Sequence, residues 1–257
     1  GKLLTIIPEM KFIPMQRKDN RLSAQLRPLS LQFGFQHHPV GSVLMGFGHT
    51  RVLCSVSVEQ SVPRWMKEQN QPGGWITAEY QMLPGATAQR TEREVTRGKL
   101  SGRSAEIQRL IGRSLRAVVD LSLLPGLTLH VDCDVIDADG GTRCAAITGA
   151  ALALECAVRK LLRQGILTES PLKDRVAAVS VGMLSGQVLL DLCYEEDSAA
   201  DVDMNVVMTA GGRFVELQGS GEEASFSEAE LGQLLSTARC GMQEIFAFTA
   251  KALRDAE

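Results

Sequence analysis

The 257-residue sequence lacks the features that mark several large classes of protein. Its apolar runs are only a few residues long, whereas a membrane-spanning helix requires roughly 18 to 20. The N-terminus shows no charged segment followed by a long apolar segment and a small-residue cleavage site. The six cysteines form no C-x-x-C pair, which is typical of reduced thiols. We therefore expect a cytoplasmic protein with no membrane partner.

Familiar motifs of metal and nucleotide chemistry are missing as well. The four histidines form no H-E-x-x-H motif and no cluster with cysteine, so a zinc site has no ligands and any metal would have to use carboxylates. Neither G-x-G-x-x-G nor G-x-x-x-x-G-K-[ST] follows an expected strand, which excludes the common nucleotide-binding loops. With 44% hydrophobic and 22% charged residues, the chain has the composition of an ordinary globular protein.

Charge is unevenly distributed along this chain of net charge −3. Residues 84–116 contain eight Lys or Arg against three Glu, whereas residues 190–257 contain fourteen Asp or Glu against four Lys or Arg. A basic segment within an acidic chain predicts a confined anion site. The alternative is an arginine-rich helix face that only meets solvent.

Hydrophobic periodicity predicts an α+β fold with mixed or antiparallel sheets and helices packed on them. Strands are expected within residues 41–58 (a hairpin around Gly48), 128–135, 177–184, 188–194, 205–208 and 214–218. Helices are expected over residues 104–121, over 143–163 and from Ser227 to the C-terminal region, with a long irregular segment over residues 64–102. We interpret residues 1–14 as an extension or cloning remnant and residues 15–257 as a single domain.

The strongest candidate for chemistry is the segment Asp139-Gly140-Gly141-Thr142-Arg143, between an expected strand and a long helix. Glycine backbone N–H groups can approach an anion closely, the helix N-terminus attracts negative charge, and Thr142 and Arg143 add side-chain donors. These features predict a phosphate site. The alternative is a plain glycine turn with Thr142 as the N-cap and Arg143 exposed.

Two further candidates accompany this segment. Arg103 immediately precedes an expected helix. A guanidinium at this position can bind phosphate through two hydrogen bonds. The alternative is an ordinary surface arginine. Asp197 and Asp203 belong to an acidic stretch beyond an apolar strand, and the small residues 198–200 would let the chain bring them together. Such carboxylates can bind Mg²⁺ or transfer protons, or they can form an acidic solvated loop.

Several stretches of the chain together resemble the ribonuclease PH family, phosphate-dependent exoribonucleases that trim the 3′ ends of tRNA precursors. The resemblance runs from about Arg21 to the last helix. The stretches that carry it are Gln25-Leu-Arg-Pro28, Gly41-Ser-Val-Leu44, Gly74-Trp-Ile-Thr-Ala-Glu-Tyr80, Glu106-Ile-Gln-Arg-Leu-Ile-Gly-Arg113, Asp132-Cys-Asp-Val135, Ala138-Asp-Gly-Gly-Thr-Arg143, Glu196-Asp-Ser-Ala-Ala200 and Asp203-Met-Asn-Val-Val-Met208.

The resemblance implies a β-α-β-α core like that of the second domain of ribosomal protein S5, and a hexameric ring built from three dimers. It also assigns roles to residues of this sequence. The implied phosphate-binding residues are Arg103, Gly141, Thr142 and Arg143, the implied catalytic or metal-associated pair is Asp197 and Asp203, and the implied RNA contacts are Arg90 and Arg93.

The resulting functional hypothesis is a phosphate-dependent 3′→5′ exoribonuclease. It would use inorganic phosphate as co-substrate, with Mg²⁺ near the carboxylate pair, and would release the 3′-terminal nucleotides of tRNA precursors as nucleoside diphosphates. One alternative is a catalytically inactive RNA-binding subunit of a similar ring. Another is a nuclease in which water replaces phosphate.

Overall fold

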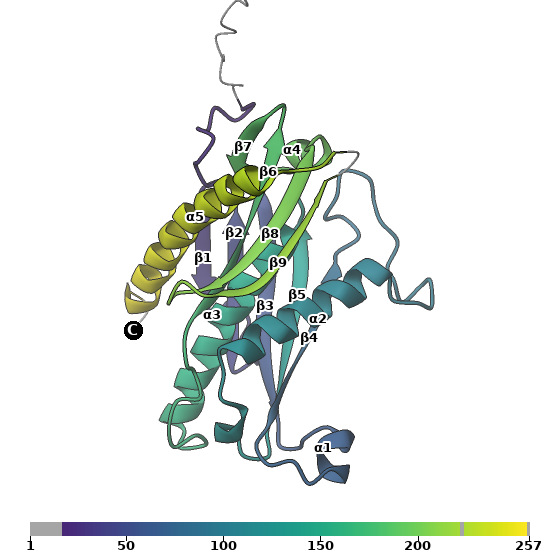
Figure 1. Ribbon diagram of the computed structural model, residues 1–257. Helices are drawn as coiled ribbons and strands as arrows, with labels where there is room; N and C mark the ends of the chain where they lie inside the picture. Colours follow the sequence, from purple (N-terminus) through teal and green to yellow (C-terminus); the bar gives the residue numbers. More distant parts are fainter. Residues whose placement is uncertain (1–16, 222–223, 256–257) are drawn as a thin grey trace, which may run out of the picture.

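The computed structural model of the chain describes residues 17–221 and 224–255, so the extension expected over residues 1–14 lies outside the described residues. Two β-sheets and their covering helices form a layered α+β fold (Figure 1). The strands are β1 (Leu29–Phe33), β2 (Gly41–Phe47), β3 (Thr50–Glu59), β4 (Trp75–Met82), β5 (Thr128–Asp137), β6 (Val176–Leu184), β7 (Gln187–Leu190), β8 (Val202–Thr209) and β9 (Phe214–Gly221). The α-helices are α1 (Arg64–Glu68), α2 (Gly102–Ala117), α3 (Thr142–Arg163), α4 (Tyr194–Ser198) and α5 (Glu228–Asp255), with a short 3-10 helix over Leu121–Leu123.

The two sheets differ in the direction of their strands. The first sheet has the order β1-β2-β3-β5-β4, and all its neighbours are antiparallel except β4 and β5, which are parallel. The second has the order β7-β6-β8-β9 and is antiparallel throughout. The expected α+β fold with mixed and antiparallel sheets is therefore confirmed.

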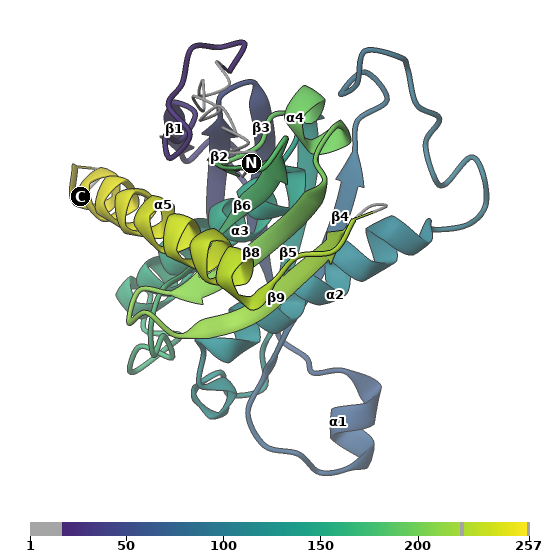
Figure 2. The same ribbon diagram turned by 45° about the horizontal axis from the view of Figure 1, so that its top comes forward.

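Helix α3 forms the centre of the core. It packs on β2 and β3 of the first sheet and on β6 of the second, and fifteen of its 22 residues are buried. A helix that is apolar on most of its circumference is stable only when it is enclosed in this way. Helix α2 packs along β4 and helix α5 lies across β6 and β7 (Figure 2). No helix within the described residues is long and apolar enough to span a membrane.

The prediction of one irregular segment over residues 64–102 was wrong. It contains α1 and the strand β4, whose Ile76, Ala78 and Tyr80 alternate into the core. This short alternation was obscured by the Pro-Gly-Gly sequence that precedes it. The expected strand over residues 188–194 ends at Leu190, because the next residue, Asp191, has a left-handed backbone with φ of 55°, and helix α4 starts at Tyr194.

The N-terminal end of β4 generates a stability prediction. A Cβ atom at Gly74 would overlap the backbone carbonyl oxygens of Leu124 and Leu127, whereas one at Gly85 would meet no atom within 4 Å. Displacing these backbone atoms would distort the surrounding structure. We therefore expect Gly74→Ala to lower the free energy of unfolding by about 1–3 kcal/mol. Urea denaturation would measure this loss, with Gly85→Ala as the matched control. Equal stability of the two variants would contradict the account.

Candidate active site

The loop between β5 and α3 has the backbone shape expected of an anion-binding turn. Gly140 and Gly141 both have left-handed conformations, with φ angles of 73° and 67°. Gly141 is the N-cap of α3 and no side chain caps this helix end, so the alternative with Thr142 as the N-cap is wrong. A Cβ atom at Gly140 would lie 2.7 to 2.8 Å from the backbone of residues 192–194. Glycine is therefore required both for the turn and for its close approach to the start of α4.

The hydroxyl of Tyr80 lies among the residues expected to bind phosphate. Tyr80 is 2% exposed, and its phenol oxygen lies 2.8 Å from Oγ1 of Thr142, the first residue of α3. Burial raises the pKa of Tyr80, while the charges of Arg103 and Arg143 act in the opposite direction. Both guanidinium groups therefore act electrostatically on the phenol. The ends of β4, α2 and α3 thus meet at one point.

Arg143 is held in place by side chains from both halves of the chain. Its Nη1 donates to Oε1 of Gln218 on β9 at 2.8 Å and lies 3.4 Å from Oε1 of Glu106 on α2. The amide of Gln218 donates in turn to Glu106 at 2.7 Å. With a side chain that is 17% exposed, Arg143 is not the solvent-facing residue of the alternative interpretation.

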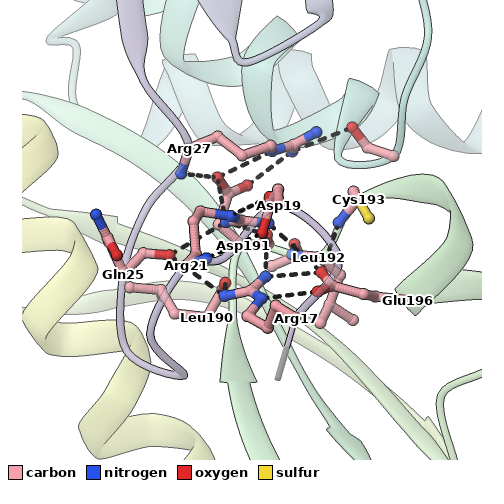
Figure 3. Close-up of polar contacts among 12 residues, drawn as sticks. Arg17, Asp19, Arg21, Gln25, Arg27, Leu190, Asp191, Leu192, Cys193 and Glu196 are labelled. Atoms are coloured by element: carbon pink, nitrogen blue, oxygen red, sulfur yellow. Dashed lines mark hydrogen bonds and ion pairs between the residues drawn. The ribbon is translucent and has the colours of Figure 1, made fainter. Parts of the chain in front are cut away.

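A buried ion pair between Arg27 and Asp191, drawn in Figure 3, is hydrogen-bonded to the glycine turn. Arg27 is 4% exposed and binds both carboxylate oxygens of Asp191, at 2.7 Å and 3.0 Å. Its two terminal nitrogens also donate to the backbone carbonyls of Asp139 and Gly140. Burial lowers the pKa of Arg27, but the charge and hydrogen bonds of Asp191 more than reverse this effect, so the guanidinium stays charged.

A second buried arginine fixes helix α4. Nε and Nη2 of Arg17 each donate to one carboxylate oxygen of Glu196 at 2.7 Å, and Nη1 donates to the carbonyl of Leu190 at 2.9 Å (Figure 3). Burial raises the pKa of Glu196, but hydrogen bonds from Arg17 and from the backbone of Cys193 lower it below its usual value. Two-point binding of this kind restricts the orientation of α4, which carries Asp197.

The two candidate catalytic carboxylates lie on consecutive elements. Asp197 is exposed on α4, and Asp203 is half-buried on β8, opposite Gly182 and Ser220. The thiol of Cys144 in the first turn of α3 donates to Oδ1 of Asn205 at 3.3 Å, so β8 passes this end of α3 two residues beyond Asp203. Asp197 is on the neighbouring helix α4 and is exposed to solvent.

The arginines expected to contact RNA lie in the connection between β4 and α2. Arg90 and Arg93 are both exposed there. The connection is attached to α2 by Glu94, which accepts a hydrogen bond from the hydroxyl of Ser104 at 2.7 Å. Arg103 is also exposed and is the second residue of α2, so the basic connection leads directly to a residue that the sequence predicts to bind phosphate.

Sequence reasoning missed the residues that support the site from within the protein. These are Arg27, Tyr80, Glu106, Asp191 and Gln218. A signal existed for Tyr80, because the alternation of buried residues along β4 places its hydroxyl group in the core. The partners of the others come from distant segments, and no local pattern identifies them.

The buried ion pair generates a second prediction. Asp191→Ala leaves the charge of Arg27 buried without its partner, so we expect the free energy of unfolding to fall by about 3–5 kcal/mol. Urea denaturation at neutral pH would measure this. The control is Glu68→Ala, which removes the partner of Arg64 in an exposed pair and should cost no more than about 0.5 kcal/mol. A loss for Asp191→Ala as small as the control would refute a supporting role for the pair.

Comparison with known proteins gives consistent matches along the chain. The model for the 3′ exoribonuclease family matches residues 25–160 with its domain 1 and residues 174–240 with its domain 2. Ribonuclease PH of Bacillus subtilis is 55% identical over 240 residues, which cover 93% of this chain and 97% of that protein. Ribonuclease PH of Bacillus velezensis is 56% identical over 230 residues, which cover 89% and 93% respectively.

Solved structures share the fold at lower sequence identity. Rice Rrp46 superposes with a TM-score of 0.75 at 23% identity, covering 92% of this chain and all of that one. The Archaeoglobus fulgidus exosome with RNA bound to the active site gives a TM-score of 0.72 at 23% identity, covering 94% and 92%. The family resemblance seen in the sequence motifs is thus confirmed: the chain belongs to the RNase PH family of 3′ exoribonucleases.

Proposed function

We infer that this chain is a phosphorolytic 3′→5′ exoribonuclease, which uses inorganic phosphate to release the last nucleotide of an RNA as a nucleoside diphosphate. Membership of the family supports the activity. The feature that favours phosphate over water as the attacking group is the uncapped N-terminus of α3, where Thr142 and Arg143 lie and where the charge of Arg103 acts on the adjoining Tyr80. Two guanidinium groups, a hydroxyl and helix N–H groups suit a phosphate dianion, whereas a water molecule needs none of these charges.

In the proposed mechanism the protein acts mainly by positioning. Arg103, Thr142, Arg143 and the backbone of Gly141 hold inorganic phosphate in line with the terminal phosphodiester. One phosphate oxygen forms a bond to that phosphorus as the bond to the 3′ oxygen of the preceding nucleotide breaks. The arginines stabilise the negative charge on the phosphoryl oxygens, which is the main contribution that a protein makes to phosphoryl transfer.

We assign Asp197 and Asp203 to the leaving-group side of the reaction. Within residues 17–221 and 224–255 no three His, Cys, Asp or Glu side chains are grouped to hold a metal ion. Mg²⁺ is often held by one or two carboxylates together with substrate phosphates, and this pair suits that mode. A bound Mg²⁺ would offset charge on the scissile phosphate. The alternative role for Asp203 is to donate a proton to the departing 3′ oxygen.

Substrate and assembly complete the proposal. Arg90 and Arg93, on the exposed connection that leads to Arg103, would contact the backbone of the RNA, with the 3′ end of a tRNA precursor as the substrate. A hexamer built as a trimer of dimers would repeat this basic segment around a ring and form a path for RNA that one acidic chain lacks. The six cysteines are free, which supports a cytoplasmic location.

The first test of the function is the identity of the released nucleotide. A tRNA with a short 3′ extension, incubated with the protein and inorganic phosphate, should yield nucleoside diphosphates, and none when phosphate is omitted. Arg103→Ala should raise KM for phosphate at least about tenfold, because a charged hydrogen-bonding group is lost. Arg109→Ala removes an exposed arginine from the same helix and is the control.

Other results would contradict the proposed function or the role of Arg103. Monophosphates would indicate hydrolysis by water, and RNA binding without any release would indicate a non-catalytic subunit. Equal weakening of RNA binding and phosphate use by Arg103→Ala would remove this residue from the phosphate site.

The carboxylate assignment gives a separate prediction. Asp203→Asn should lower kcat by about a hundredfold or more, because the uncharged amide neither binds Mg²⁺ well nor donates an acidic proton. Asp201→Asn changes a neighbouring exposed carboxylate, which accepts from the backbone of Ser185, and should retain activity. Light scattering would check that both variants keep six times the mass of one chain. A wild-type rate for Asp203→Asn would exclude it from the reaction.

A further inference from the structure

We propose that Tyr80 is a positioning residue of the phosphate site: its phenol donates a hydrogen bond to Thr142 and thereby directs the Thr142 hydroxyl proton toward bound phosphate. This inference rests on the proposed function and refines it. Tyr80 itself is buried beneath the site, so it would act through Thr142 and not through direct contact with the ligand.

The surroundings of Tyr80 leave its ring little freedom. It lies on β4 beside Cys133 of β5, and it is among the largest fully buried side chains in the described part of the chain. The partner oxygen of Thr142, 2.8 Å away, is also in a buried residue, 5% exposed. A ring fixed by core packing presents its hydroxyl at one place, so it can orient a neighbouring group without loss of side-chain entropy.

Charge determines which of the two hydroxyls donates. The positive charges of Arg103 and Arg143 both act on the phenol, and the 2.8 Å contact between Tyr80 and Thr142 allows either hydroxyl to donate. Cations favour the oxygen lone pairs of Tyr80, and its proton is then free for Thr142. Because burial raises the pKa of Tyr80, the phenol keeps this proton at neutral pH.

The direction of this bond decides what Thr142 can do. A hydroxyl has one proton to donate, and it can accept at its lone pairs at the same time. When Thr142 accepts from Tyr80, its own proton remains available to an anion at the N-terminus of α3. Hydrogen bonds in such a chain also polarise one another, which strengthens the final contact with phosphate.

A purely structural role for the hydroxyl predicts a different result. A buried hydroxyl that only satisfies its neighbour contributes to folding and leaves ligand affinity unchanged. The chain offers a matched example in Ser114 on α2, which is fully buried and donates to the carbonyl of Leu110 at 2.7 Å. Ser114→Ala therefore shows the effect of losing one buried hydrogen bond away from the phosphate site.

The experiment uses the full chain and compares Tyr80→Phe with Ser114→Ala. We expect Tyr80→Phe to raise KM for inorganic phosphate by about three- to tenfold, the equivalent of one hydrogen bond, with kcat and KM for RNA changed less than twofold. Titration calorimetry with inorganic phosphate alone should show the same weakening. Ser114→Ala should lower Tm without changing either phosphate measurement.

A double-mutant cycle with Thr142→Val tests whether Tyr80 acts through Thr142. If it does, adding Tyr80→Phe to Thr142→Val produces no further rise in KM for phosphate, whereas independent effects would multiply. An unchanged KM in Tyr80→Phe, an equal rise in KM for RNA, or multiplied effects would overturn the inference. Loss of folding in Tyr80→Phe, which keeps the whole ring, would overturn it too.

These outcomes are distinct from a failure of the proposed function. If the wild-type protein releases no nucleoside diphosphate in the presence of phosphate, the function itself is wrong. If it does, and Tyr80→Phe uses phosphate as well as the wild type, only the role of Tyr80 is wrong.

Discussion

The arrangement of the site depends on the buried ion pair between Arg27 and Asp191. One guanidinium satisfies a carboxylate from the second half of the chain and two backbone carbonyls of the glycine turn at the same time. Burial of two charges is costly, so the pair is compatible with folding only when nearly all of its hydrogen bonds form. This requirement fixes the turn before Thr142 against the residues that precede α4, and it couples the two halves of the chain.

The proposed anion site is then assembled from the ends of elements that the core holds in place. Helix α3 is enclosed by both sheets, so the direction of its N-terminus cannot vary. Strand β4 places the hydroxyl of Tyr80 within hydrogen-bond distance of Thr142, and Gln218 on β9 accepts a hydrogen bond from Arg143. Thr142 and Arg143 thus stand on a rigid helix, and each is held by a second buried or half-buried group. Such support is what phosphoryl transfer requires of a protein, since positioning makes the largest contribution.

Sequence patterns predicted much of this architecture because the patterns are local. Alternation along β5 and the three- and four-residue spacing in α2 reflect the periods of a strand and a helix, and both elements form where expected. Strand β4 was missed because only three alternating core residues follow its glycines. The glycine turn forms where the sequence predicts it, and its N-cap is Gly141, which has a left-handed backbone, whereas the alternative interpretation placed the N-cap at Thr142.

The sequence by itself determined which chemical groups are present: the glycine turn, the arginines of the basic segment and the carboxylates that follow β7. It also determined the family, because many short motifs occur in order. Only the tertiary structure decided which groups meet. Tyr80 and Thr142 are 62 residues apart, and Arg27 and Asp191 are 164 residues apart. Contacts across such separations are set by the packing of the common core, which no single segment of the sequence encodes.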